Sequence, residues 1–289
     1  MRYTNIVQHL IDKANIIVEA LPYINKLAGK IVVIKYGGNA MNDAAVVNTV
    51  MQDTAVLKMV GVCPILVHGG GPEINSLLTK LNIKSEFVGG LRVTDKDTME
   101  VVQMALCGKL NKNIAAQLTS LGVKAIGLSG KDAGLIEATT IDKNLGYVGK
   151  ITSINTKLLL ELCKGEYVPV IASIGTDKDG NSYNINADTA AGEIAAALSA
   201  EKLIFLTDTD GIRRNPSDPK TLIPEISISQ IKALIKDGTI SGGMIPKAEG
   251  CIRGVEKGIN RVHIIDGTIP HSILLEIFTD TGIGTMVKK

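Results

Sequence analysis

The sequence predicts an α/β protein, a three-layer αβα sandwich with a mainly parallel central sheet and two lobes. After residue 29, short β-branched runs alternate with longer stretches of helical periodicity. The strand-like runs are continuously apolar, which is typical of strands that helices cover on both faces. A chain of 289 residues can bury one large core of this kind or two fused lobes.

The elements are predicted in chain order from these patterns. Strands are expected at residues 31–35, 64–67, 124–128, 167–172, 203–207 and 262–265. Helices are expected at residues 43–60, 72–81, 96–107, 111–121, 156–163, 187–200, 229–236 and 244–257. The stretch 134–152 is interpreted as a hairpin insertion, because Gly146 and Gly149 stand between two β-rich pieces.

A turn-rich polar break at residues 175–180 predicts the boundary between an N-terminal lobe, 29–180, and a C-terminal lobe, 181–289. Residues 1–28 stand apart as a helix with Thr4 as its N-cap and Pro22 as its end. Its apolar residues recur at spacings of three and four: Val7, Leu10, Ala14, Ile17 and Leu21. This stripe fits either a helix packed on its own domain or an oligomerisation helix packed on another subunit.

Bulk composition excludes several classes of protein. The net charge is +2 and the basic residues are scattered, so we expect no nucleic-acid partner. The four cysteines form no CxxC pair, which argues against disulfides and zinc. Asp12 and Glu19 interrupt the apolar residues of the N-terminus, so it is not a signal peptide, and no stretch is long and apolar enough to span a membrane. We therefore expect a soluble, cytoplasmic protein.

Two glycine-rich loops carry the first chemical signal. The GxxxxGK[ST], GxGxxG, HRD and DFG motifs are all absent, which disfavours P-loop enzymes and protein kinases. Instead, Lys35-Tyr36-Gly37-Gly38 ends the first predicted strand, and His68-Gly69-Gly70-Gly71-Pro72 ends the second and opens a helix. Consecutive glycines let backbone N–H groups approach an anion, and a helix N-terminus favours negative charge. The loops are therefore candidates to hold a phosphoryl group and the group that attacks it.

The second half supplies complementary groups. Residues 207–211 (Thr-Asp-Thr-Asp-Gly) place carboxylates at the end of a strand, and residues 242–247 carry a glycine pair and Lys247 into a helix. Asn184 and Asp188 flank the start of the predicted helix 187–200. Each feature has an ordinary structural explanation on its own, such as a solvated lysine or a helix-capping charge.

In combination, these motifs resemble the amino-acid kinase family over residues 30–287. The ordered set is Lys-x-Gly-Gly at 35–38, His-Gly-Gly-Gly-Pro at 68–72, Asn-x-Asn-Ala-Asp at 184–188, Leu-Thr-Asp-x-x-Gly at 206–211 and Gly-Gly-Met-x-x-Lys at 242–247. Gly-Leu-Arg-Val-Thr-Asp at 90–95 and the tail 274–286 are similar to the branch that acts on N-acetyl-L-glutamate. The resemblance implies transfer of the γ-phosphoryl group of ATP to the side-chain carboxylate of that acid, in arginine biosynthesis. Sister kinases of glutamate, aspartate or carbamate, and a non-catalytic sensor of the same fold, are the alternatives.

The resemblance also implies site residues. Lys35 and Lys247 would neutralise the transferring phosphoryl group, and Asp188 would orient both lysines. The other expected roles are phosphate binding by Gly37 and Gly38, binding of the acid by Gly70, Gly71, Arg92 and Asn184, and ATP binding by Asp208, Gly211, Ile212, Arg213, Thr239 and Ser241. ATP is expected with Mg²⁺ as its substrate complex, with no tightly bound cofactor and no protein metal ligand assigned.

The N-terminal helix resembles that of the arginine-inhibited members of the family. This implies a homohexamer built as a trimer of dimers, with L-arginine as inhibitor. The effector site is expected between that helix and the C-terminal region, at His263, Asp266, Gly267, Glu276, Gly282 and Gly284. Thr268 departs from the family pattern, which more often has Arg at that position.

Overall fold

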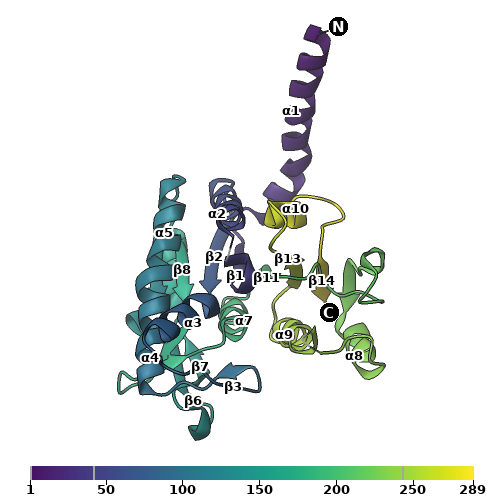
Figure 1. Cartoon of the computed structure of the whole chain (residues 1–289). Coiled ribbons are helices and arrows are strands. Elements are labelled where there is room, and N and C mark those ends of the chain that lie inside the picture. Colours follow the sequence, from purple (N-terminus) through teal and green to yellow (C-terminus); the bar gives the residue numbers. More distant parts are fainter. Residues whose placement is uncertain (1, 42, 243) are drawn as a thin grey trace.

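An eight-stranded, mainly parallel sheet forms the centre of the computed structural model, which describes residues 2–41, 43–242 and 244–289 (Figure 1). Gly243 of the predicted glycine pair lies outside the described residues. The strands in spatial order are β12 (Glu225–Ser227), β14 (Thr285–Lys288), β13 (Arg261–Asp266), β11 (Lys202–Thr207), β1 (Ile31–Tyr36), β2 (Cys63–His68), β8 (Val168–Ala172) and β5 (Ala125–Ser129). Only the β13–β14 pairing of this sheet is antiparallel.

Helices cover both faces of this sheet, which confirms the predicted three layers. One face carries α2 (Ala44–Met59), α5 (Asn111–Ser120) and α10 (Ser272–Ile277). The other carries α6 (Thr156–Lys164), α7 (Ala187–Ala197), α8 (Ile228–Lys236) and α9 (Met244–Glu256). In β1, Val33 packs in one layer while Val32 and Ile34 pack in the other, so the strand is buried on both faces.

Smaller elements gather at the carboxyl edge of the sheet. The predicted hairpin insertion forms β6 (Ile136–Thr140) and β7 (Gly149–Ile154), which join a four-stranded sheet with β9 (Ile174–Thr176) and β10 (Ser182–Asn184). A two-stranded sheet, β3 (Phe87–Val88) and β4 (Leu91–Arg92), lies near α3 (Gly71–Lys80) and α4 (Lys96–Gln103). The described residues include 3₁₀ turns at Gly38–Met41, Asp132–Gly134, Lys143–Leu145 and Pro219–Thr221.

The predicted lobe boundary at 175–180 is the turn of the β9–β10 hairpin. The central sheet runs across the two predicted lobes without a break, because β1 pairs with β11. The division into lobes remains a prediction.

The N-terminal helix differs from its predicted limits. α1 (Arg2–Leu27) begins before Thr4 and includes Pro22, so neither residue marks an end. Pro22 removes one helical hydrogen bond, but the chain stays helical because Leu27 is buried and Ala28 N–H donates to Ile24 O at 2.8 Å. The helix projects from the body (Figure 1), and no helix in the described ranges is long and apolar enough to cross a membrane.

The helices predicted at 96–107 and 111–121 are one continuous rod. Its middle, Met104–Leu110, is π-helical, with α4 before it and α5 after it. Between the two predicted helices, Gly108 was the only glycine or proline that indicated a break, and it lies inside the π-helical segment.

Candidate active site

A cavity of about 230 Å³ lies at the carboxyl ends of β1 and β2, where the helices α3 and α7 begin. We call it the acid cavity. Its lining includes eight residues expected to bind the phosphoryl group or the acid, namely Lys35, Gly37, Gly38, Gly70, Gly71, Arg92, Asn184 and Asp188. Residues more than 150 positions apart in sequence therefore share one site. The first N–H groups of a helix have no intrahelical acceptor, so both helix starts favour an anion here.

Local geometry favours glycine at Gly38 and Gly70 of the acid cavity, whereas a Cβ on Gly37 would make only ordinary contacts. Gly38 has φ +69°, a left-handed conformation that favours glycine. A Cβ on Gly37 would stand 3.5 Å from Lys35 Nζ and 3.6 Å from the Gly69 nitrogen. A Cβ on Gly70 would clash with Leu110, and would lie 2.6 Å from Leu106 Cδ2. The loops thus bring bare backbone to the cavity wall.

Lys35 and Asp188 form the ion pair of this cavity. Lys35 Nζ lies 2.9 Å from Asp188 Oδ1, and the lysine side chain is only 14% exposed. The pair lacks the alignment of a hydrogen bond. Lys35 lies near the end of β1 and Asp188 in the first turn of α7, so the pair joins the sheet to the helix at the wall of the cavity.

Arg92 is a buried cation without a carboxylate partner. Its residue is 7% exposed, and its guanidinium donates to Ser85 Oγ and, at 2.6 Å, to Asn75 Oδ1. It also stacks over the Phe87 ring at 4.6 Å. Burial lowers the pKa of Arg92. Among the residues that the structure describes, no Asp or Glu pairs with it, which leaves a desolvated positive charge facing the cavity.

Asn184 is tied to the same strand pair as Arg92. Its Nδ2 donates to Thr94 Oγ1 at 3.1 Å, and Thr94 Oγ1 donates to the Arg92 carbonyl at 2.7 Å. Thr94 is fully buried. The chain of bonds fixes Asn184 beside the guanidinium without using its carbonyl oxygen.

A second cavity, of about 480 Å³, lies beyond the ends of β11 and β13; we call it the nucleotide cavity. Its lining includes all the residues expected to bind ATP: Asp208, Gly211, Ile212, Arg213, Thr239 and Ser241. Arg213 donates to both carboxylate oxygens of Asp210, through Nε at 3.0 Å and Nη2 at 2.8 Å.

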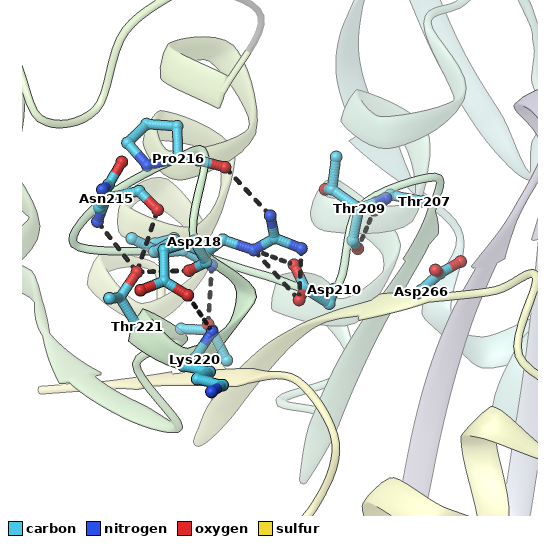
Figure 2. Close-up of polar contacts among 12 residues, drawn as sticks. Thr207, Thr209, Asp210, Asn215, Pro216, Asp218, Lys220, Thr221 and Asp266 are labelled. Carbon is cyan, nitrogen blue, oxygen red and sulfur yellow. Dashed lines mark hydrogen bonds and ion pairs between the residues drawn. The ribbon is translucent and has the colours of Figure 1, made fainter.

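Local turns support the wall of the nucleotide cavity (Figure 2). Thr207 Oγ1 donates to the Thr209 carbonyl at 2.8 Å, which tightens the chain as it leaves β11. In the neighbouring loop, Thr221 Oγ1 donates to the Asn215 carbonyl at 3.0 Å, and Arg213 Nη1 donates to the Pro216 carbonyl at 3.0 Å. The loop is therefore held by its own polar groups.

Lys247 lies on the nucleotide side rather than beside Asp188. Its Nζ is 3.3 Å from Asp208 Oδ1, and it stands in the first turns of α9. The predicted orientation of both lysines by Asp188 thus differs from the structure, which gives each lysine its own aspartate. The two lysines belong to separate ion pairs, one at each cavity.

A third cavity, of about 360 Å³, lies between the end of α1 and the C-terminal region; we call it the effector cavity. Of the residues expected there, His263, Glu276 and Gly282 line it. Asp266 instead lines the nucleotide cavity, because it ends β13 at the carboxyl edge. Gly267 and Gly284 line neither: the N–H of Gly267 donates to the Thr207 carbonyl, and that of Gly284 donates to Glu276 Oε2 at 2.9 Å.

A buried polar chain forms the floor of the effector cavity. Lys202 Nζ lies 3.0 Å from His263 Nε2, and His263 Nδ1 lies 2.7 Å from Glu276 Oε1. Burial lowers the pKa of Lys202 to about 8 and also lowers that of His263. The pKa of Glu276 is lowered too: burial opposes this, but the hydrogen bond with His263 and the N–H groups of Ile283 and Gly284 outweigh it.

Several lining residues were missed from the sequence. In the acid cavity, Phe87 was missed, together with Asn75 and Ser85, which lie behind the lining and hydrogen-bond to Arg92. In the effector cavity, the missed residues include Tyr23, Lys26, Lys202 and Arg261. Tyr23, whose hydroxyl donates to Asp280, was hidden because Pro22 was interpreted as the helix end.

Comparisons with known proteins agree with this geometry. Residues 30–266 match the amino acid kinase family, and the chain belongs to that family. It is 56% identical to the acetylglutamate kinase of Caldicellulosiruptor bescii, over 96% of this chain and 97% of that protein.

Among solved structures, the chain resembles N-acetylglutamate synthase from Neisseria gonorrhoeae complexed with coenzyme A and N-acetyl-glutamate. The TM-score is 0.83 at 26% identity, over 96% of this chain and 63% of that one. The same synthase complexed with coenzyme A and L-arginine gives a TM-score of 0.78 at 25% identity, over 94% of this chain and 64% of that one. This chain therefore spans less than two thirds of the synthase.

Proposed function

We propose that this protein transfers the γ-phosphoryl group of ATP to the side-chain carboxylate of N-acetyl-L-glutamate and forms an acyl phosphate. The observation that carries the proposal is the buried, carboxylate-free guanidinium of Arg92, which shares the acid cavity with the Lys35–Asp188 pair. A small dicarboxylic acid fits this arrangement: one carboxylate meets Arg92, and the other lies toward the glycine loops, where Lys35 meets the phosphoryl group as it is transferred. High identity to acetylglutamate kinases over nearly the full length supports this substrate.

The residues of the acid cavity act by positioning and by charge. Arg92 grips the α-carboxylate of the acid, and Asn184 adds a polar contact. The side-chain carboxylate then lies near the glycine loops, whose N–H groups and helix start stabilise negative charge. Lys35, held by Asp188, neutralises the oxygens of the phosphoryl group as it moves between donor and acceptor.

ATP occupies the nucleotide cavity, with its phosphates directed toward Lys247 and the acid cavity. Mg²⁺ accompanies ATP and offsets charge on the phosphates. Within the described ranges, no three His, Cys, Asp or Glu side chains group to hold a metal. Phosphate oxygens and water would hold most of the ion's ligand positions, and Asp208, which lines the nucleotide cavity beside Lys247, would be a carboxylate available to it.

Formation of a hydroxamate from the acyl phosphate tests the proposal. Purified protein, ATP, Mg²⁺ and hydroxylamine are incubated with N-acetyl-L-glutamate and, in parallel, with glutamate, aspartate and carbamate. We expect hydroxamate from N-acetyl-L-glutamate and little ADP release with the others. Equal turnover of free glutamate would contradict the proposal, and ATP binding without any turnover would favour the sensor alternative.

We further propose that L-arginine inhibits the enzyme by binding in the effector cavity, and that α1 assembles dimers into a hexamer. The cavity combines carboxylates and cations, Glu276 and Asp280 beside Lys26 and Arg261, which suits a zwitterionic, cationic amino acid. α1 contributes Tyr23 to this wall while much of its apolar surface stays exposed, such as Leu10 at 57% and Ile17 at 67%.

Deletion of residues 1–26 tests both parts of this regulatory proposal. It removes the exposed stripe and the two polar α1 residues of the cavity, but leaves the buried Leu27. We expect a smaller oligomer by sedimentation that remains active and no longer responds to arginine. A full-length protein that sediments as a dimer and ignores millimolar arginine would contradict it.

A further inference from the structure

A buried histidine lies directly behind the glycine loop of the acid cavity, and the proposed mechanism does not use it. His68 ends β2 and is 0% exposed. Its Nδ1 lies 2.9 Å from the Gly69 carbonyl oxygen, and its Nε2 lies 3.1 Å from Asn111 Nδ2. A carbonyl oxygen only accepts, so Nδ1 carries the proton and Nε2 accepts from Asn111.

Asn111 fixes that tautomer independently. It is 1% exposed, and its Nδ2 also donates to the carbonyls of Val170 at 2.9 Å and Leu128 at 3.1 Å. The two carbonyl acceptors place the amide nitrogen on this side, and its two N–H groups are shared among three acceptors. An amide nitrogen does not accept, so His68 Nε2 must be unprotonated. Burial lowers the pKa of His68 to about 4, which agrees with a neutral ring. One side chain thus joins the ends of β2, β8 and β5.

The same helical rod reaches the glycine loop a second time. The π-helical segment Met104–Leu110 ends immediately before Asn111, and its Leu106 and Leu110 are the side chains that a Cβ on Gly70 would strike. A Cβ on Gly127 would likewise strike Asn111 Oδ1. π-Helical insertions occur frequently at functional sites because they shift side chains out of α-helical register. Here the insertion gives Asn111 and two leucines their places behind the loop.

The loop is therefore held on both sides of Gly69. The Gly69 N–H donates to the Tyr36 carbonyl at 3.1 Å, and its carbonyl accepts from His68. The Gly69 N–H and the Gly69 carbonyl belong to successive peptide groups, and the second of these also carries the Gly70 N–H. The bond from His68 therefore orients the Gly70 N–H directly, and the Gly71 N–H follows at the start of α3.

We propose that His68 and Asn111 are positioning residues that lock the glycine loop 69–71, with the π-helical segment as their support, so that its N–H groups meet the transferring phosphoryl group and its acceptor. The inference rests on the kinase function proposed above. Neither side chain touches the substrate: both act through the Gly69 peptide.

Two substitutions at one position separate this role from simple core packing. His68→Asn keeps an amide N–H near the Nδ1 position, and so the bond to the Gly69 carbonyl, but loses the contact with Asn111. His68→Gln places its amide near the Nε2 position, and so keeps the contact with Asn111, but loses the donor to Gly69. Thr54→Val is the matched control, because it removes another fully buried hydrogen bond, to the Val50 carbonyl, within α2.

The readouts are kcat by hydroxamate formation, melting temperature, and amide hydrogen exchange of a peptide covering residues 67–78. We expect His68→Gln to lower kcat by about 10- to 100-fold, the cost of a misplaced reacting group. Its loop should exchange about tenfold faster, which is the scale of one lost hydrogen bond. His68→Asn should stay closer to wild type in both, and Thr54→Val should lower only the melting temperature.

The outcomes separate this inference from the proposed function. Wild-type kcat in both His68 variants, or kcat losses that simply follow melting temperature, would overturn the inference. Loop exchange that is unchanged in His68→Gln would overturn it as well, and needs no substrate. A wild-type protein that forms no hydroxamate would contradict the proposed function, while the exchange comparison would still decide whether His68 locks the loop.

Discussion

The acid cavity and the nucleotide cavity lie along the same edge of one sheet but differ in whether their charged side chains already have partners of opposite charge. In the acid cavity, Arg92 has only neutral partners, Asn75 and Ser85 among them. In the nucleotide cavity, Asp210 is bound by Arg213 and Asp208 by Lys247. An unmatched buried charge is costly until its ligand arrives, so we expect the acid cavity to recognise its ligand mainly by charge. For the larger nucleotide cavity, whose charges are internally paired, we expect recognition mainly by shape.

Substitution of either lysine, Lys35 or Lys247, should give the largest loss of activity. It tests most directly whether both cavities contribute to phosphoryl transfer. Lys35→Ala and Lys247→Ala should each lower kcat by about 10²- to 10³-fold, the range for removing one preorganised stabilising group. Both KM values should change much less, because the lysines meet charge that develops during transfer. Steady-state hydroxamate kinetics measure this, with Lys124→Ala as the control, since that lysine is exposed and distant. Near-normal turnover in either variant would remove that lysine from the mechanism.

Arg92 tests whether the acid cavity works by charge geometry. Arg92→Lys keeps the positive charge but loses the planar two-donor grip and the stacking on Phe87. The KM for N-acetyl-L-glutamate should rise by about 10- to 100-fold, with the KM for ATP nearly unchanged. Arg253→Lys, at an exposed arginine on α9, is the matched substitution and should change neither constant. Equal weakening of both substrates would indicate a folding defect instead.

Asp210 tests the opposite claim, that charge in the nucleotide cavity is structural. Asp210→Asn weakens the bidentate pair with Arg213 and loosens the wall that Pro216 helps to hold. Because this pair is partly exposed, the KM for ATP should rise by only about fivefold, and the KM for the acid should not change. A loss as large as that of Arg92→Lys would show that the two cavities use charge in the same way.

The smallest effect concerns the frame behind the acid cavity. The folded-state pKa of His68, about 4, lies below the ordinary 6.5. Unfolded chains therefore bind a proton first as pH falls, so this contribution to stability is complete above pH 6.5 and is lost progressively as pH falls toward 4. Between pH 6.5 and 5, wild type should lose about 1.6 kcal/mol of unfolding free energy that His68→Asn does not lose. Denaturant melts at both pH values measure the difference, and parallel losses would contradict it.

The parallel core was predictable because its physics is local. Buried parallel strands are continuous apolar runs, so residues 31–35 and 203–207 indicated β1 and β11. The three-residue strands β9, β10 and β12 are too short to carry any periodicity, and β14 entered only as a tail motif. These short strands form only because they pair with strands distant in sequence, and no local pattern in a single sequence indicates such pairing.

The candidate sites were predictable to different depths for a similar reason. Glycine loops and lysines at strand ends form recognisable sequence motifs, so Gly37 and Lys35 were identified from the sequence. The structure places both in the acid cavity. Partner choice depends on side-chain reach: Lys247 meets Asp208 rather than Asp188, and Asp266 faces the nucleotide cavity. Such pairings are set by the packing of α9 and β13, which no spacing in the sequence records.

The π-helical segment Met104–Leu110 has a consequence for how sequences of this fold can change length. Relative to an α-helix, such a segment accommodates one additional residue within an otherwise regular rod. Deleting one residue there would convert the segment to α-helix and leave α5 on its present face, so Asn111 would keep its contacts with β2, β8 and β5. Deleting one residue within α5 itself would rotate every position after it by about 100°. A one-residue change of length is therefore absorbed within the π-helical segment, whereas the same change after Asn111 would replace the face that α5 presents to the sheet.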